Sequence, residues 1–499
     1  MNFIERNDQF SENLMLADDQ GNRITYGEFE KIYEERSKFL EEGRLAFLYC
    51  RNTVGAVLYY RSCLRNHVVP LLLEHRMDRE LLRTLIGTYE PDYLIGMPED
   101  LTGTDGTVLE GSECFGYQLA KRDAKRKTGL NPELALLLTT SGSTGSPKLV
   151  RQSRKNVTSN AESIAEYLEL DPTERPITTL PMNYTYGLSI MNSHFQVGAA
   201  VLLTEHTLFE REFWDFFREQ GATSFGGVPY TYQILKRLDF FKMELPSLRT
   251  MTQAGGKLPV NLHREFAEYA MSTGRKFIVM YGQTEATARM SYLPAEDAIR
   301  KCGSMGIAIP GGKFRIMEDS PTEIKEPDTV GELVYSGPNV TMGYAECAAD
   351  LEKGDERGGV LFTGDMAKRD AEGYYYITGR KKRFLKMYGK RVNMDEIEQL
   401  LRGRYEGVEL ACTGEDDRMR IYMEGMDPAS CEEAAEFLTE KTGLYPEVSG
   451  FFPSTRYRKL SPEKRSTKNW RNCHGIHDLR EKRHNSTDHD QPSEGIKRV

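Results

Sequence analysis

Short apolar runs alternate with amphipathic stretches along most of this chain. An alternation of this kind is typical of layered α/β proteins, in which helices connect mostly parallel strands. The sequence therefore predicts an α/β fold whose large N-terminal domain has mostly parallel sheets. The runs with the length and residue types of strands are Leu45–Cys50, Val68–Leu73, Leu134–Thr139, Ala199–Thr204 and Phe277–Met280. The stretches with helical spacing are Tyr26–Leu40, Arg79–Tyr89, Asn156–Leu168 and Leu208–Gln220.

Length and composition narrow the class of protein. The chain has 499 residues, 39% hydrophobic and 28% charged, which suits a globular protein of about two to four domains. No apolar run approaches the ~18 residues of a membrane span, and Met1–Gln20 lacks the pattern of a signal peptide. The net charge of −9 disfavours a nucleic-acid partner. Eight scattered cysteines indicate free thiols, so we expect a cytoplasmic protein with no membrane span.

The pattern of apolar and charged residues changes at two places toward the C-terminus. The strand-like segment Gly373–Thr378 is followed by the basic run Arg380–Arg383 and by a helix that Asn393 can cap. The last 47 residues hold twelve Lys and Arg against six Asp and Glu, without helical or strand periodicity. We predict a large domain over residues 1–380, a small α+β domain over residues 381–452, and a disordered or frameshifted tail over residues 453–499.

The segment Thr140–Lys148 (TSGSTGSPK) carries the strongest chemical signal. It follows a buried strand and offers glycines, hydroxyl groups and backbone amides that can wrap a polyphosphate, while Lys148 can neutralise its charge. It is not a Walker A loop, because Pro147 precedes the lysine and no helix follows directly. A plain Ser/Gly linker is the alternative, but linkers rarely follow a buried strand and end in Pro-Lys before an apolar residue.

Taken whole, this loop resembles the phosphate loop of the adenylate-forming superfamily, which includes acyl-CoA synthetases, firefly-type luciferases and peptide-synthetase adenylation domains. The resemblance covers roughly residues 15–450 and implies a large layered α/β domain followed by a small mobile α+β lid. Further motifs of the family follow in its order: Asp18–Phe29 (DDQGNRITYGEF), Leu48–Leu73, Tyr281–Thr287 (YGQTEAT), Gly331–Tyr344 (GELVYSGPNVTMGY), Thr363–Asp365 (TGD) and Gly379–Arg380.

The resemblance implies a role for each motif residue. Tyr281 can stack on adenine, Thr284 can donate to the α-phosphate, and Glu285 is the expected ligand of Mg²⁺. Asp365 can accept both ribose hydroxyls, and Arg380 can approach the ribose or the phosphate. The catalytic residues implied are Thr284, Glu285 and Arg380. The ATP-binding residues implied are Thr140, Ser141, Gly142, Ser143, Thr144, Gly145, Lys148, Gly255, Gly256, Tyr281, Gly282 and Asp365.

Each of these residues also has a plainer interpretation. Tyr281 could be a core tyrosine, Glu285 a carboxylate at a helix start, and Asp365 a turn former. The basic run Arg380–Arg383 could be a solvated face or a nucleic-acid patch, although the negative net charge disfavours the latter.

The small domain resembles the family's lid. Lys382 occupies the hinge position, and Gly389 falls in the turn that contributes to the thiol tunnel of relatives. A swing about this hinge would let one site run two half-reactions. In the first, a carboxylate attacks ATP, pyrophosphate leaves and an acyl-adenylate forms. In the second, a thiol of CoA or of a carrier-protein phosphopantetheine takes the acyl group.

The segment Pro181–Leu188 (PMNYTYGL) departs from many relatives. Tyr184 stands where many acyl- and aryl-CoA ligases have His, and residues 183–187 lack the Asp that pairs an amino-acid ammonium group. An acyl or aryl acid without charge is therefore favoured over an α-amino acid. The expected acyl pocket is mainly apolar, with Tyr186 and Tyr230 beside its residues Tyr184, Gly187, Gly227 and Val228.

The C-terminal segment is the second departure. Relatives end in an IPRTxxGK-like motif whose lysine assists adenylation, whereas this chain reads FFPSTRYRKLSPEKRSTKNW. With synonymous codons, a shifted frame over Arg456–Trp470 can spell IPKTVSGKTEYKEL, so we hypothesise a frameshift after about Phe451. Lys459 and Lys464 are conceivable substitutes. The predicted function is ATP-dependent, Mg²⁺-assisted activation of a carboxylic acid; the alternatives are an amino-acid:carrier-protein ligase and a catalytically impaired nucleotide- or acyl-binding homologue.

Overall fold

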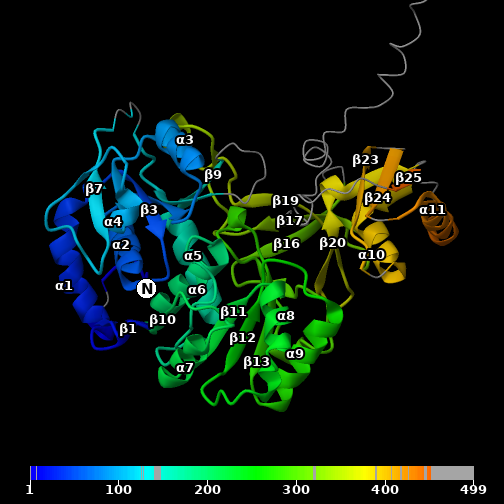
Figure 1. Cartoon of the computed structure of the whole chain (residues 1–499), viewed down its shortest axis with the longest axis horizontal. Helices are drawn as coiled ribbons and strands as arrows, with labels where there is room; N and C mark the ends of the chain where they lie inside the picture. Colours follow the sequence, from blue (N-terminus) through cyan, green and yellow to red (C-terminus); the bar gives the residue numbers. More distant parts are fainter. Residues whose placement is uncertain are drawn as a thin grey trace, which may run out of the picture. The chain divides into compact units, whose positions relative to one another are not determined.

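The computed structural model describes residues 2–450 apart from residues 7, 125, 127–128, 140–147, 319–321, 388–389, 406, 416–417, 425 and 443–446. The chain divides into two compact units (Figure 1). The first, the large unit, runs to Thr378, and the second, the small unit, begins at Gly379. None of the described helices is long and apolar enough to cross a bilayer.

The large unit contains an eight-stranded sheet in the order β18-β9-β8-β4-β3-β5-β7-β6. Its four central strands β8, β4, β3 and β5 are parallel, and the strands at both edges are antiparallel to their neighbours. The strands are β3 (Leu45–Cys50), β4 (Val69–Glu74), β5 (Tyr93–Gly96), β6 (Thr107–Val108), β7 (Gln118–Lys121), β8 (Leu134–Thr139), β9 (Leu149–Ser153) and β18 (Gly343–Ala345).

Three further sheets complete the large unit. The five-stranded sheet β11-β12-β13-β14-β15 has a parallel first half and an antiparallel second half. Its strands are β11 (Ser224–Gly227), β12 (Thr250–Gln253), β13 (Lys276–Tyr281), β14 (Ser291–Tyr292) and β15 (Ile307–Ala308). The sheet β10-β1-β2 contains β1 (Leu14–Asp18), β2 (Arg23–Thr25) and β10 (Val201–Leu203). The sheet β16-β17-β19-β20 contains β16 (Lys313–Met317), β17 (Gly331–Ser336), β19 (Val360–Arg369) and β20 (Tyr375–Arg380).

Helices cover the two largest sheets. Helices α7, α8 and α9 place their apolar side chains in the core of the five-stranded sheet, and Figure 1 shows α8 and α9 beside β13. Helices α5 and α6 contribute to the cores of both large sheets, because they bury residues on more than one face. The helices are α1 (Tyr26–Arg36), α2 (Val54–Arg65), α3 (Arg79–Tyr89), α4 (Pro98–Leu101), α5 (Arg154–Tyr167), α6 (Thr185–Gln196), α7 (Arg211–Glu219), α8 (Pro229–Arg237) and α9 (Val260–Ser272).

The predicted layered α/β fold is confirmed, with sheets that are more mixed than expected. Strands β3 and β8 and helix α3 have the predicted bounds. Helix α1 ends at Arg36, earlier than predicted, because residues 37–39 tighten into a 3₁₀ turn. The antiparallel sheet around β17 was not predicted, since its short strands carry no parallel-sheet apolar run. The thiols of Cys50, Cys63, Cys114, Cys302, Cys347 and Cys412 are free, as expected, and that of Cys347 is exposed.

The small unit is an α+β structure with its own hydrophobic core. Asn393 caps α10 by accepting the backbone N–H of Asp395 at 2.9 Å, and Ile397 and Leu401 are buried, whereas Leu400 is exposed. The elements are β21 (Phe384–Met387), β22 (Lys390–Asn393), α10 (Met394–Arg404), β23 (Leu410–Glu415), β24 (Arg418–Met423), α11 (Pro428–Thr442) and β25 (Glu447–Gly450).

Arg383 ties the start of the small unit to its helix and sheet. Its Nε donates to Asp395 at 2.9 Å, its Nη1 donates to the Cys412 carbonyl at 2.7 Å, and its Nη2 is paired with the buried Glu398. Glu398 in turn accepts the Cys412 N–H at 2.8 Å. This member of the basic run is therefore neither a solvated charge nor a nucleic-acid contact.

Replacing Arg383 should destabilise the small unit selectively. In Arg383→Met, Glu398 stays buried without its cation, so we expect the free energy of unfolding of this unit to fall by about 3–5 kcal/mol. Arg402→Met is the matched control, because Arg402 also contacts Glu398 but is half exposed; we expect a loss below about 1 kcal/mol. Hydrogen exchange of α10 and β23 amides measures both, and equal losses would contradict the assignment.

Candidate active site

The loop after β13 is folded back on itself under backbone strain. Thr287 and Ala288 adopt positive φ angles of 61° and 141°, which residues other than glycine rarely do. At Gly282, any Cβ would clash with the Ala288 carbonyl, so only glycine fits. The YGQTEAT motif therefore encodes one fixed turn shape.

The second half of the GELVYSGPNVTMGY motif holds this strained loop in place. The buried Asn339 amide donates to the carbonyls of Ala286 at 2.8 Å and Arg289 at 3.0 Å. Thr341 donates its backbone N–H and its hydroxyl to the Glu285 carbonyl at 3.0 and 2.9 Å. Two motifs that lie about fifty residues apart in the sequence thus form one structure.

The Glu285 carboxylate faces β18. Its Oε1 accepts the Tyr344 hydroxyl at 2.7 Å, and the Arg357 guanidinium lies 4.7 Å from the centre of the Tyr344 ring. Burial, together with the charge of Glu285, raises the pKa of Tyr344 to about 12, so the phenol stays a proton donor. Glu285 is half-buried and is thus a charged oxygen ligand open to one side.

Lys148 brings a second cation to the same place. Its Nζ lies 3.8 Å from the centre of the Tyr344 ring and 3.3 Å from Glu346 Oε1. The predicted loop residues Thr140, Ser141, Gly142, Ser143, Thr144 and Gly145 lie outside the described residues. The strands that flank them are described, and Thr139 pairs with Leu149. The described residues that flank the predicted phosphate loop are therefore held in adjacent strands, and Lys148 lies on the Tyr344 ring that contacts Glu285.

Asp365 forms a second polar centre with two motif residues. Its Oδ2 accepts the hydroxyl of Tyr281 and the Gln283 amide, the latter at 2.8 Å. Gln283 also donates to the Thr363 carbonyl at 3.0 Å, and Gly364 takes a φ of 69° that suits glycine. Asp365 is only 2% exposed, so its charge depends on these donors. A role for Asp365 as a turn former alone does not explain its hydrogen bonds with Tyr281 and Gln283.

The donor set of this site suits magnesium better than a self-contained metal centre. Within the described parts of the chain, no group of three or more His, Cys, Asp or Glu is placed to hold a metal ion. Mg²⁺ takes one or two protein carboxylates together with substrate phosphates. The half-buried Glu285, with one hydroxyl donor on its carboxylate, fits that arrangement.

The predicted acyl-pocket residues meet around Gly255. A Cβ at Gly255 would lie 2.5 Å from the Tyr184 hydroxyl and 3.0 Å from Val228, and its φ is 77°. Gly256 packs on Pro229 in the same turn. Tyr184 and Val228 are half-buried beside an apolar cluster that includes Leu180, Ala254 and Ile278. The structure thus brings Tyr184, Val228 and the Gly255–Gly256 turn together.

The other predicted pocket residues have packing roles in the structure. Gly187 lies against the Pro181 carbonyl, where a Cβ would approach to 2.5 Å. Gly227 lies against Thr231 of α8. Tyr186 is buried and meets the Tyr184 ring edge-on at 6.4 Å, whereas Tyr230 is 59% exposed.

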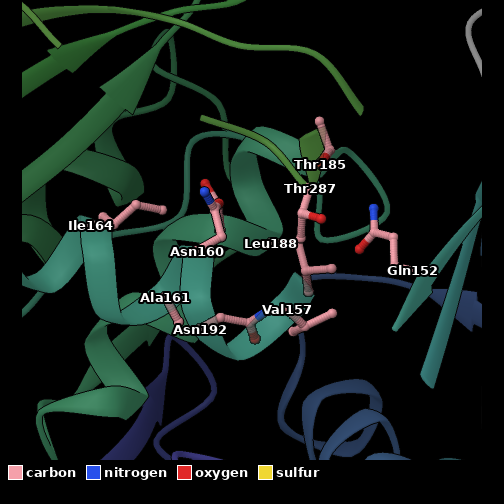
Figure 2. A pocket seen from close by; sticks show the side chains of 10 residues that line it. Gln152, Val157, Asn160, Ala161, Ile164, Thr185, Leu188, Asn192 and Thr287 are labelled. Carbon is pink, nitrogen blue, oxygen red and sulfur yellow. The ribbon is translucent and has the colours of Figure 1, made fainter. Parts of the chain in front are cut away.

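A small polar cavity lies between α5 and α6 (Figure 2). Its volume of about 10 Å³ is close to that of one water molecule. Two of its lining residues have buried polar atoms that find no hydrogen-bond partner among the described residues, namely Gln152 Nε2 and Asn160 Oδ1. Thr287 of the strained loop also lines the cavity. The cavity is suited to a bridging water and is too small for an acyl group.

The predicted residues of the small unit are only partly described. Arg380 ends β20 and is exposed. Lys382 lies in the turn Lys381–Arg383, with its side chain outside the description, and Gly389 lies outside the described residues altogether. Their roles as a catalytic, a hinge and a thiol-tunnel residue stay predictions.

Sequence reasoning missed two residues of this region. Asn339 is 1% exposed and holds the loop, and its place in the GPNVT segment was the available signal. Arg289 is 2% exposed, and a single arginine between the small residue Ala288 and the apolar Met290 could have marked it. Neither pattern says what the side chain contacts.

Removing the Asn339 amide should loosen the strained loop. In Asn339→Ala, the carbonyls of Ala286 and Arg289 lose their buried donor, so we expect stability to fall by about 1–3 kcal/mol. Amide exchange over residues 284–289 should accelerate. Asn22→Ala, which removes an amide from a turn near the N-terminus, should leave exchange in this loop unchanged. Equal exchange in both variants would show that Asn339 does not hold the loop.

This chain is similar in sequence to known CoA ligases. An indoleacetate–CoA ligase from Aromatoleum aromaticum is 32% identical over 300 residues, which are 58% of this chain and 56% of that protein. An oxalate–CoA ligase from Arabidopsis thaliana is 32% identical over 273 residues, which are 54% and 52% of the two chains. The matched region thus spans only about half the length of these relatives.

The fold has a counterpart among solved structures. The o-succinylbenzoate coenzyme A synthetase of Bacillus subtilis, solved with ATP and magnesium ion, matches 93% of this chain and 99% of its own, with a TM-score of 0.71 and 20% identity. The family model for AMP-binding enzymes matches residues 3–345, which include the phosphate loop and the YGQTEAT and GELVYSGPNVTMGY motifs. The chain belongs to the AMP-binding enzyme family.

Proposed function

We propose that this protein activates a carboxylic acid with ATP and passes the acyl group to a thiol. The observation that carries the proposal is the strained loop at Thr284–Ala288, which the GPNVTMGY segment fixes beside Tyr344 and Lys148. Family membership and the names of the relatives as CoA ligases support the same reaction class.

In the first step, a substrate carboxylate oxygen bonds to the α-phosphorus of ATP. The bond from that phosphorus to the bridging oxygen breaks, and pyrophosphate leaves. Thr284 donates to the α-phosphate, while Lys148 balances the charge of the phosphates. Glu285 would hold Mg²⁺, which when bound supplies charge stabilisation to the phosphates. Tyr344 fixes the rotamer of Glu285, so that the carboxylate is oriented before ATP binds.

The nucleoside end of ATP is assigned to the Asp365 network. Asp365 would accept ribose hydroxyls, and Tyr281 would place its ring against adenine. The hydrogen bonds from the Tyr281 hydroxyl and the Gln283 amide keep the carboxylate and ring in a fixed relation. Gly255 and Gly256 would let the backbone approach the adenylate, because neither residue has a side chain of its own.

In the second step, a thiolate sulfur bonds to the acyl carbon and the bond from that carbon to the phosphate oxygen breaks, releasing AMP. The small unit would act as the lid for this step, with Lys382 as hinge and Gly389 in the thiol tunnel. Arg380 would assist at the ribose or the phosphate. CoA is the acceptor that the names of the relatives favour, and a carrier-protein phosphopantetheine is the alternative.

The names of the relatives do not identify the carboxylic acid substrate of this protein, since they cover an indole acid and oxalate. The pocket side chains Tyr184 and Val228 are mainly apolar, and residues 183–187 offer no carboxylate for an ammonium group. These features support an acyl or aryl acid over an amino acid. A catalytically impaired binding protein is the second candidate, favoured by the missing lysine motif in the tail.

ATP–pyrophosphate exchange over fatty, aryl, hydroxy and amino acids tests the proposal. It should be run on this chain and on a version with the reading frame restored after Phe451. Exchange by the restored version alone would support the ligase and the frameshift together. Nucleotide binding without exchange by either version would favour the impaired homologue, and loss of nucleotide binding would contradict the site.

Glu285→Gln should separate the predicted metal ligand from its structural contacts. The glutamine can still accept the Tyr344 hydroxyl, but the charge is lost, so we expect exchange to fall about 100-fold or more. Lys148→Ala should cost roughly tenfold, because a neighbouring charge is lost. Glu346→Gln is the control, since it removes an exposed carboxylate near Lys148 and should leave exchange unchanged. Unchanged exchange in Glu285→Gln would mean that the site is misplaced.

A further inference from the structure

Arg289 is a buried cation without a buried anion. It is 2% exposed, and within the described parts of the chain no carboxylate lies within ion-pair distance of it. Its Nε donates to Ser189 Oγ at 3.2 Å, its Nη1 donates to Tyr167 at 3.0 Å, and its guanidinium lies 5.0 Å from the centre of the Tyr186 ring. These neutral groups solvate the charge only in part.

The other buried arginines show what compensation looks like in this fold. Arg151 donates to the carbonyls of Tyr344 at 3.0 Å and Gly354 at 3.2 Å, and it is paired with Glu356. Arg61 lies against three aromatic rings, and burial lowers its pKa to about 10. Within the part of the chain that the structure describes, Arg289 has no carboxylate partner and lies against a single ring, that of Tyr186.

One nitrogen of Arg289 is left over. Its Nη2 makes no hydrogen bond with any described residue, whereas its Nε and Nη1 each have a neutral partner. A guanidinium stays protonated in proteins, so it cannot escape burial by losing its charge. A buried fixed charge with a donor that no described residue accepts is an incomplete anion site.

The location of Arg289 points to the acyl group. Tyr186 contacts both the Arg289 guanidinium and, edge-on, the ring of Tyr184, which touches the Gly255 turn. Tyr184, Tyr186 and Val228 belong to one apolar cluster, and Met280, which contacts Arg289 Nη1 at 3.3 Å, belongs to it too. Arg289 thus lies at the wall of the predicted acyl pocket, while Glu285 of the same loop faces Tyr344.

We propose that the acid activated by this protein carries a second carboxylate, which pairs with Arg289. This inference rests on the proposed function and specifies its substrate class. The reacting carboxylate would lie at the Thr284 end of the loop, and the second carboxylate would accept Nη2–H, with the apolar cluster around the chain between them. The same charge repels an ammonium group, so α-amino acids are excluded twice. The sequence favoured an uncharged acyl chain because residues 183–187 have no charged side chain, whereas Arg289 lies about a hundred residues further along.

Binding of stable adenylate mimics to the full chain tests this without turnover. The probes are sulfamoyladenosine conjugates of straight α,ω-dicarboxylic acids of increasing length, each beside the conjugate whose far carboxylate is replaced by a carboxamide. At the best length, calorimetry should show the carboxylate form binding roughly ten- to a hundred-fold tighter. Arg289→Met should reduce this ratio to about one, Arg289→Lys should keep part of it, and AMP should bind equally to all three proteins.

Stability separates this role from a structural one. Because Arg289 is uncompensated, the ligand-free Arg289→Met protein should melt at the same temperature as the parent or higher, whereas Arg151→Met should melt lower. The inference is overturned if the parent protein shows no preference for the carboxylate probe at any length, or if that preference survives in Arg289→Met. It is also overturned if the Arg289→Met protein melts at a temperature as low as that of Arg151→Met. If AMP still binds in those cases, the proposed function is still supported and only the dicarboxylic-acid inference fails. If the parent protein binds neither AMP nor the probes, the proposed function and the inference are both contradicted.

Discussion

The buried side-chain amide of Asn339 is the contact on which the candidate site depends. It bridges the carbonyls of Ala286 and Arg289, and so it spans the two positive-φ residues that lie between them. Strain of this kind persists only where the surrounding structure fixes it. Glu285 and Arg289 are both attached to this turn. The Asn339 amide therefore sets the position of the Glu285 carboxylate, which faces Tyr344, and of the Arg289 guanidinium, which faces Tyr186.

The sequence predicted the parts of this arrangement that are local. Apolar runs located β3, β8 and α3, since strand and helix periods are properties of neighbouring residues. Motif resemblance singled out Tyr281, Glu285 and Asp365 as candidate site residues. It could not show that Tyr281 donates to Asp365, or that Gln283 joins them, because those contacts form only when β13 and β19 are assembled.

The same limit explains what the sequence did not reveal about charge. A charged residue in a one-dimensional string gives no sign of whether it meets a counterion, solvent or an empty space. Arg383 ends a basic run and Arg289 follows small residues, yet among the described residues the first meets Asp395 and Glu398 and the second meets neutral groups. Only burial and partners together distinguish Arg383, which stabilises the small unit, from Arg289, which is a candidate recognition group.

The pairing of β18 with β9 has a consequence for how the protein is made. β9 ends at Ser153, but its edge partner begins only at Gly343, and the same late segment supplies Asn339 and Tyr344 to the active site. A chain leaving the ribosome therefore exposes an unpaired β9 edge for about 190 residues of synthesis, at a rate of some 5–20 residues per second. The candidate site cannot be complete during that interval, so a nucleotide that binds there would stabilise only a nearly finished chain.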